Sequence, residues 1–125
     1  MREIKFRAWD KAEKRWYDYE DSEIFIDLHG QPLIYTAENP YPFANTDIEL
    51  MQYTGLKDKN GKEIYEGDII KYKTIYKWDK NPIKLKPVVF ENGMFTPQGV
   101  IKYLGNNIEV IGNIHDNPEL LEDDQ

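Results

Sequence analysis

The sequence contains no cysteine, one serine and four alanines among its 125 residues. Without cysteine, disulfides, zinc fingers, iron–sulfur clusters and cysteine nucleophiles are excluded. No apolar run approaches the roughly 20 residues that a membrane span needs. Charged residues at positions 2, 3, 5 and 7 leave no apolar stretch at the start, so we expect no signal peptide. We therefore expect no membrane partner, and a compartment that tolerates a chain without disulfides, such as the cytoplasm.

Residues suited to nucleophilic catalysis are scarce and scattered. Ser22, the only serine, lies in an acidic stretch with no histidine within six residues. The only histidines are His29, beside a turn glycine, and His115, near the C-terminus. A serine nucleophile requires a positioned base next to it, and nothing in this spacing supplies one. We expect no catalytic residue and no enzymatic activity.

Metal and cofactor sites are not indicated either. Three acidic residues, Asp21, Glu23 and Asp27, are spaced two and four apart, but no glycine-containing calcium loop surrounds them. His115 and Asp116 form an isolated pair, and a solvated acidic surface is the simpler interpretation of both groups. We expect no metal ligand and no cofactor.

The residues that are abundant favour β-structure. Hydrophobic residues make up 40% and aromatic residues 14%, which is enough for a core, and Ile, Val, Tyr and Phe outnumber alanine. Turn signals recur every 8–12 residues, and no ten-residue segment has helical periodicity. This predicts a mostly β protein, less than a fifth helical, in which about Met51 to Asn117 closes into a small barrel. We expect an N-terminal β-rich section with its connector at 1–48, a barrel at 49–117 and an acidic tail at 118–125.

Glycine-containing dipeptides predict the turns. Asn60-Gly61 suits a type I′ hairpin turn, in which both residues have positive φ, and Asn92-Gly93 predicts a second hairpin of the same kind. Glu66-Gly67-Asp68 has the pattern of a structural turn, in which Gly67 takes positive φ and Asp68 accepts hydrogen bonds from nearby backbone amides. A general acid/base pair made of Glu66 and Asp68 is the weaker interpretation.

Prolines mark two irregular segments. Ala37–Asp47 holds Asn39-Pro40 and Pro42, which exclude a central strand and predict a connector. Trp78–Pro87 holds Pro82 and Pro87, and we expect an irregular loop there.

Charge is unevenly distributed along a chain of net charge −7. Residues 71–86 hold six Lys and one Asp, giving +5, so the rest of the chain carries −12. Small barrels bind single-stranded nucleic acid with cationic loops and stacking aromatic rings. The candidate contacts are Lys71, Lys73, Tyr76, Lys77, Trp78, Lys80, Lys84 and Lys86. Against this interpretation stand the acidity of the chain and the ordinary use of lysine on exposed strand faces and edges.

Aromatic residues crowd the N-terminal section. Alternation along Glu3–Trp9 places Trp9 on the face of Lys5 and Arg7, which is the exposed face if Ile4, Phe6 and Ala8 point inward. A large ring on that face would be covered by the following segment or by another subunit. We therefore expect a homo-oligomer.

Three blocks of sequence resemble the YopX family of phage and prophage proteins. They are Lys5–Asp10, Met51–Ile70 and Val110–Leu121, which lie in the family's order and frame almost the whole chain. The resemblance implies a β fold whose C-terminal part is similar to an SH3-type barrel, and a cytoplasmic location in a bacterial host. It implies no activity and transfers no catalytic or binding residue. Our leading hypothesis is a non-enzymatic phage accessory protein acting through contacts with an unknown host or phage protein. The alternative is a single-stranded nucleic-acid-binding barrel that uses the loop Lys71–Lys86.

Overall fold

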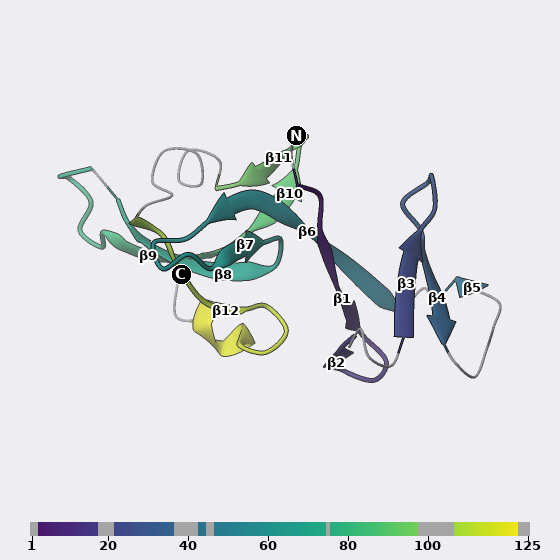
Figure 1. The fold of residues 1–125 in the computed structure, drawn as a ribbon. Coiled ribbons are helices and arrows are strands. Elements are labelled where there is room, and N and C mark those ends of the chain that lie inside the picture. The colour runs from purple at the N-terminus through teal and green to yellow at the C-terminus, as the bar shows by residue number, and fades with distance from the viewer. Residues whose placement is uncertain are drawn as a thin grey trace. The chain divides into compact units, whose positions relative to one another are not determined.

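The computed structural model describes residues 3–17, 22–36, 43–44, 47–74, 76–97 and 107–122. The chain is mostly β, as the composition predicts, with a short 3-10 helix, η2 (Pro118–Leu121), near its C-terminus. It divides into two compact units, which we describe separately: the N-terminal unit, Phe6–Met51, and the C-terminal unit, which combines Met1–Lys5 with Gln52–Gln125 (Figure 1). Strand β6 (Ile48–Lys57) contributes residues to both.

The N-terminal unit begins with a tight hairpin of β1 (Phe6–Asp10) and β2 (Arg15–Trp16), paired antiparallel with Trp9 opposite Trp16. Asp10 organises its turn. Asp10 Oδ1 accepts the N–H groups of Ala12 and Glu13 at 2.9 and 3.0 Å, and Asp10 Oδ2 accepts the Tyr17 hydroxyl at 3.0 Å. Burial and this bond to Asp10 raise the pKa of Tyr17 to about 12. The turn is therefore fixed by one buried carboxylate.

Trp9 is only 9% exposed, because the next strand covers it. The Trp16 ring lies against the Trp9 ring at a centroid distance of 4.9 Å, edge to face, and the Arg7 guanidinium lies 4.8 Å from the centre of the Trp16 ring. The sequence predicts that either the following segment or another subunit covers Trp9, and in the structure the following segment does so. The argument from Trp9 to a second subunit is thereby removed, and the oligomeric state stays a prediction.

The rest of the N-terminal unit is a second antiparallel sheet in the order β3-β4-β5. Its strands are β3 (Ser22–Ile26), β4 (Pro32–Thr36) and β5 (Phe43–Ala44). The loop Asp27–Gln31 joins β3 to β4, with Gly30 at φ +81°. Most of the predicted connector Ala37–Asp47 lies outside the described residues. A small cluster of Ala8 and Ile48, packed by Tyr17 and Leu50, forms the buried part of this unit.

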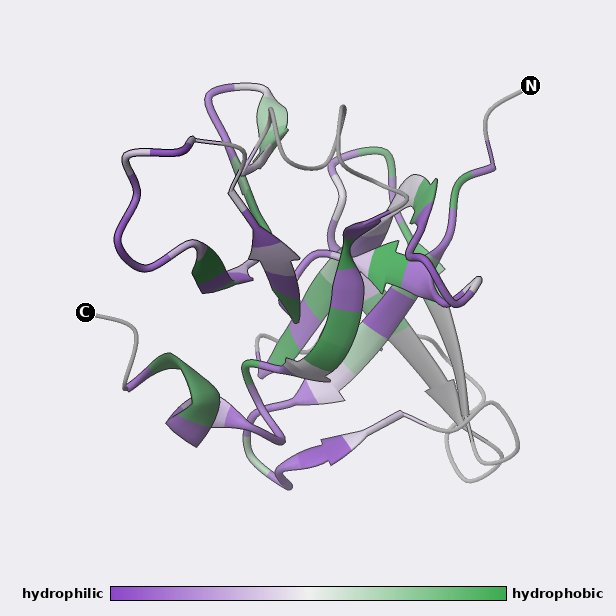
Figure 2. Ribbon diagram, turned by 90° about the vertical axis from the view of Figure 1, so that its left-hand side faces the viewer, coloured by the Kyte–Doolittle hydropathy of each residue, from purple (hydrophilic) through white to green (hydrophobic). Residues whose placement is uncertain are grey.

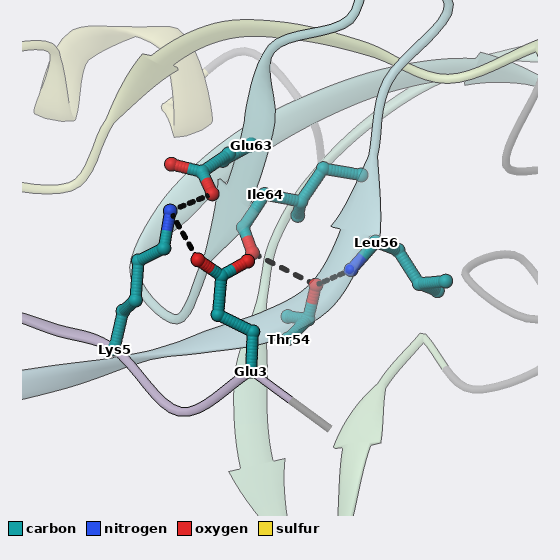
Figure 3. Close-up of polar contacts among 6 residues, drawn as sticks. All are labelled: Glu3, Lys5, Thr54, Leu56, Glu63 and Ile64. Carbon is teal, nitrogen blue, oxygen red and sulfur yellow. Dashed lines mark hydrogen bonds and ion pairs between the residues drawn. The ribbon is translucent and has the colours of Figure 1, made fainter. Parts of the chain in front are cut away.

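In the C-terminal unit, β6 pairs with β7 (Glu63–Tyr65) through an irregular ladder. Tyr53 lies opposite Tyr65 and Lys57 opposite Glu63, so β6 carries two extra residues between the two pairs. Thr54 stabilises this bulge, because its hydroxyl donates to the Ile64 carbonyl at 2.8 Å and accepts the Leu56 N–H at 3.2 Å (Figure 3). Gly55 takes the φ of +91° that the bulge requires.

The start of the chain belongs to the same unit. The Tyr53 N–H donates to the Lys5 carbonyl at 2.9 Å, and Lys5 Nζ lies 2.5 Å from Glu63 Oε2 and 3.1 Å from Glu3 Oε1 (Figure 3). The hydrogen bond to Glu63, followed by that to Glu3, raises the pKa of Lys5 above its usual range. The first described residues are thus bound to β6 and β7.

The core of the C-terminal unit lies on the sheet β12-β8-β9, all antiparallel, made of β8 (Asp68–Lys73), β9 (Ile83–Pro87) and β12 (Glu109–Asn113). Hydrophobic and hydrophilic bands alternate along its strands (Figure 2). The buried cluster contains Ile64, Ile70, Tyr72, Val88, Ile108 and Val110, with Phe95 packed against it. Strands β10 (Val89–Glu91) and β11 (Met94–Thr96) form a separate hairpin. These curled antiparallel sheets fit a small β module, while closure into an SH3-like barrel over residues 49–117 stays a prediction.

The two Asn-Gly dipeptides form different turns. Asn92 and Gly93 both have positive φ, +53° and +80°, in the two-residue loop between β10 and β11, which is the geometry expected of a type I′ turn. The type I′ assignment at Asn60-Gly61 is wrong, because only Gly61 has positive φ there. The Gly61 N–H donates to the Asp58 carbonyl at 3.0 Å, so Lys59 and Asn60 occupy the centre of the turn and Gly61 follows as the left-handed residue of a three-residue loop.

The segment Trp78–Pro87 is also not the irregular loop that its prolines predicted. β9 occupies Ile83–Pro87 and pairs with β8 along its length. Pro82 directly precedes the strand and Pro87 is its last residue. Prolines at those places remove no donor from the middle of the ladder, so the strand forms between them.

None of the helical segments in the described ranges has the length and apolar character needed to cross a bilayer.

Candidate functional site

The predicted lysine loop Lys71–Lys86 is a β-hairpin. Its strands β8 and β9 pair with Lys71 opposite Leu85, Tyr72 opposite Lys84 and Ile70 opposite Lys86. Directly opposed residues share a face, and successive residues alternate between faces. Lys71 and Lys73 therefore lie on one face of the hairpin, while Lys84 and Lys86 lie on the face of the core residues Ile70 and Tyr72. The four strand lysines do not form one basic surface.

The loop that joins β8 to β9 is held by Asp79. Asp79 Oδ1 accepts the Asn81 N–H at 2.9 Å, and Asp79 Oδ2 accepts the Thr74 hydroxyl at 2.9 Å and lies 3.5 Å from Lys84 Nζ. The Asn81 N–H, and after it the Thr74 hydroxyl and Lys84, hold the pKa of Asp79 below its usual value. Lys84, on β9, is thus paired with the loop residue Asp79 and helps to fix the shape of the loop.

At the end of this hairpin two aromatic rings are exposed. Tyr76 and Trp78 stack at a centroid distance of 5.2 Å and an interplanar angle of 22°, and they are 57% and 77% exposed. The Asp79 N–H donates to the Tyr76 carbonyl at 3.1 Å, which closes a turn with Lys77 and Trp78 at its centre. Lys77 and Lys80 are exposed beside the rings. We call Tyr76, Lys77, Trp78 and Lys80 the hairpin tip.

The structure therefore brings four of the eight predicted contact residues together and separates the other four. The hairpin tip presents two cations and two π faces on a closed turn, which can bind anionic groups, planar groups or apolar side chains. Sequence reasoning missed Ile83, which is 50% exposed at the start of β9. The sequence signal for this residue was its position just after Asn81-Pro82, a turn dipeptide after which a strand begins.

The predicted turn residues have structural roles. The Tyr65 N–H donates to Asp68 Oδ2 at 2.7 Å, and Gly67 has φ +88°. Asp68 is buried at the first position of β8. These contacts agree with a structural interpretation of Glu66-Gly67-Asp68, in which a carboxylate and a glycine shape the entry into β8.

Two further carboxylates have similar roles that the sequence did not lead us to predict. Asp58 Oδ1 accepts the N–H groups of Asn60 and Lys62 at 2.8 and 2.9 Å, and its Oδ2 accepts the Val110 N–H at 2.9 Å. The other is Asp10, at the turn after β1. The signal for Asp58 was an aspartate three residues before a turn glycine.

The last of the family-like blocks is also organised by side chains that bond the backbone. Asn113 Oδ1 accepts the N–H groups of His115 and Asp116 at 3.0 and 2.9 Å. At Gly112 a Cβ would lie 2.5 Å from Asn117 Oδ1, so a larger residue would have to displace the Asn117 side chain. Each of the three blocks thus contains a residue whose side chain stabilises the fold by bonding the backbone.

Within the described ranges, no three histidine or acidic side chains gather where a metal ion would be held. Asp21, one of the acidic residues considered above, lies outside those ranges.

Comparison with known proteins relates almost the whole chain to one protein family. A family model described as "YopX protein" matches residues 5–122. The SPbeta prophage-derived uncharacterized protein YopX of Bacillus subtilis (strain 168) is 29% identical over 133 residues, covering 94% of this chain and 95% of that protein. The crystal structure of protein EF1440 from Enterococcus faecalis is similar with a TM-score of 0.59 and 32% identity, covering 96% of this chain and 99% of that one. The crystal structure of YopX from Bacillus subtilis is similar with a TM-score of 0.60 and 25% identity, covering 98% and 100%.

Proposed function

This chain belongs to the YopX family of phage and prophage proteins, and we propose that it is an accessory protein that acts by binding other proteins. Its place of action is the cytoplasm of the bacterial host, and it performs no catalysis. The contacts of Asp10, Asp58 and Asn113 in the family-like blocks are structural, so the proposal rests on a surface outside those blocks.

The hairpin tip carries the proposal. Tryptophan and tyrosine dominate the binding energy of protein interfaces, because each buries a large, rigid surface at little cost in conformational entropy. An exposed Trp78, held by a closed turn and stacked on Tyr76, offers such an anchor already in position. The exposed side chains of Lys77 and Lys80 supply the polar surroundings that a partner with acidic groups would match.

The experiment is affinity capture from phage-infected host cells with the parent protein and with Trp78→Ala, followed by titration of any captured protein in purified form. We expect Trp78→Ala to weaken the purified interaction at least about 30-fold, the effect of losing a residue worth ~2 kcal/mol in an interface. Leu28→Ala is the matched control, because it also removes an exposed apolar side chain but from the other unit. A captured partner that binds all three forms equally would contradict the proposal.

Single-stranded nucleic acid is a second candidate ligand, favoured by the exposed ring stack beside two lysines. The net charge of −7 and the division of the strand lysines over two faces count against it. If this candidate is right, a fluorescent oligonucleotide should bind at low salt, and log K should fall with log salt with a slope of roughly −2 to −4. No shift at tens of micromolar protein would leave protein binding as the proposal.

A further inference from the structure

The hairpin tip and the C-terminal turn of the same unit are chemically complementary. The tip presents Lys77 and Lys80 around the exposed rings of Tyr76 and Trp78. Residues 107–125 contain no Lys or Arg, and the acidic residues Asp116, Glu119 and Glu122 are exposed there. A cationic, aromatic surface and an acidic surface therefore lie on every copy of the chain.

The acidic side also offers apolar surface for the rings. Pro118 opens the helix η2, and Asn117 Oδ1 accepts the Asn113 N–H at 3.3 Å, which ties the turn to the end of β12. Glu119 on η2 is exposed, and so is Glu122, the first residue after the helix. Leu120 and Leu121 lie between these two acidic residues and are half-buried. The two surfaces are complementary: the carboxylates of the η2 turn are opposite in charge to the lysines of the tip, and the leucines of the turn offer apolar surface to the aromatic rings of the tip.

The two surfaces are located apart on the C-terminal unit. Figure 1 shows the loop between β8 and β9 projecting from the sheet, away from η2. A contact between them consequently joins two copies. We propose that the hairpin tip of one copy docks on the η2 turn of a second copy, an inference that rests on the proposed protein-binding role of the tip. Such a contact uses different surfaces on the two partners, so it propagates into a ring or an open chain.

The contact is small. Trp78 and Tyr76 each bury about 150–250 Å² when covered, so the tip provides less than the ~800 Å² per partner of a standard stable interface. We therefore expect weak association, with a dissociation constant on the order of 0.1–1 mM, typical of small transient interfaces. Because the contact pairs exposed charges, added salt should weaken it further.

The test is sedimentation equilibrium over a concentration range up to ~1 mM, the upper end of the range expected for the dissociation constant of so small an interface. The parent protein should show a weight-average mass that rises with concentration above the 14.8 kDa of the single chain. The tip variant Lys77→Glu/Lys80→Glu and the turn variant Glu119→Lys/Glu122→Lys should each stay at 14.8 kDa, because like charges then face each other. An equimolar mixture of the two variants should associate again, since each tip meets a turn of opposite charge.

A control variant separates the tip from general repulsion. Each reversal of a lysine changes the charge by −2, so the tip variant has a net charge of −11 instead of −7. Lys11→Glu/Lys14→Glu reaches the same net charge from an exposed turn of the N-terminal unit and should associate as the parent does. Circular dichroism spectra should show that all variants remain folded.

Three results would overturn this inference: a parent mass of 14.8 kDa throughout, a mixture that stays monomeric, or a control that loses association. A monomeric parent whose capture of another protein still depends on Trp78 would leave the proposed function standing. Self-association that depends on the charge pairs, with no captured protein, would instead support the tip as a surface for copies of this chain alone.

Discussion

The loops Asp27–Gln31 and Asp58–Lys62 have the same hydrogen bonds in different surroundings. In both, the first residue's N–H donates to the carbonyl of the fifth (3.1 and 2.8 Å), and the glycine N–H donates to the carbonyl of the first (3.0 Å). In both, Oδ1 of the aspartate accepts the N–H groups of the third and fifth residues, at 2.8 and 2.9 Å. The glycines have nearly equal φ, +81° and +83°.

The two loops differ in what surrounds the aspartate. Asp58 is 7% exposed, and its second oxygen accepts the Val110 N–H, which ties the loop to β12. The Lys59 N–H adds a bond to the Ile108 carbonyl at 2.9 Å. In the other loop, Leu28 is fully exposed at the turn. Aspartate and glycine at this spacing therefore build the loop in either place, and the tertiary surroundings decide whether it also holds the core together.

The largest effect should come from Asp58→Ala. The substitution removes the acceptor for three backbone N–H groups, including the buried one of Val110. We expect a loss of about 2–4 kcal/mol in the free energy of unfolding, because buried donors left without a partner cost ~1–3 kcal/mol each. Urea denaturation measures the change. A midpoint unchanged from that of the parent would show that Asp58 does not connect the loop to β12.

The glycines of the two loops should respond alike. Gly61→Val and Gly30→Val should each cost about 1–2 kcal/mol, because a β-branched residue resists positive φ. A Cβ at either position meets no atom within 4 Å, so the cost is that of the backbone alone. Urea denaturation of the pair should give values within ~0.5 kcal/mol of each other. Gly61→Asn is the matched control and should cost less, since asparagine tolerates the left-handed region.

The free energy of unfolding should fall at acid pH, because Asp58 is then protonated. Burial tends to raise the pKa of Asp58, but the N–H groups of Val110, Lys62 and Asn60 outweigh it, and the pKa lies below its usual value of 3.8. The unfolded chain therefore takes up this proton at higher pH than the folded one. The stabilisation is complete above pH 3.8 and is lost as the pH falls through that value toward the folded pKa.

Urea denaturation between pH 6 and pH 2.5 measures this dependence. The variant Asp58→Asn should lose less stability across the acid range than the parent does, because it has no proton to take up at this position. Asp10, whose pKa is also lowered, by backbone bonds that outweigh its burial, contributes in the same direction. Asp10→Asn should therefore flatten part of the profile too. Equal acid dependence in the parent and in Asp58→Asn would argue against a lowered pKa.

The smallest effect should come from Asp27→Ala. Water can replace the carboxylate at this exposed loop, so the expected loss in the free energy of unfolding is only about 0.5–1 kcal/mol. Chemical denaturation of Asp27→Ala beside Asp58→Ala makes the comparison direct. A loss at Asp27 as large as that at Asp58 would mean that the loop itself, and not its contact with β12, carries the stability.

Several parts of the fold could be read from the sequence. The abundance of Ile, Val, Tyr and Phe predicted the mostly β structure, and the family resemblance is confirmed by the match over residues 5–122. The Asn92-Gly93 turn has the backbone angles expected of it. The same dipeptide at Asn60-Gly61 was assigned wrongly, because Asp58 accepts hydrogen bonds from the following backbone and draws Asn60 into the centre of a longer turn. A prediction based on the dipeptide Asn60-Gly61 alone does not take Asp58 into account.

Half of the candidate site could be predicted and half could not. Tyr76, Lys77, Trp78 and Lys80 are close in sequence, so a single turn keeps them together. The strand lysines depend on β9, which forms between Pro82 and Pro87 where a loop was expected. Once the strand forms, alternation distributes its side chains over two faces, and the continuous basic surface suggested by composition is divided.

The sequence by itself determined the local features: β-forming composition, turn residues, uneven charge and the residues of the hairpin tip. These depend on neighbours a few positions away, whose sterics and hydrogen bonds act in any surroundings. Only the tertiary structure decided that Trp16 covers Trp9, that the lysines divide between two faces, and that Asp58 reaches Val110, 52 positions along the chain. The physical reason is that burial and pairing depend on which distant segment lies alongside, and no local pattern specifies that partner.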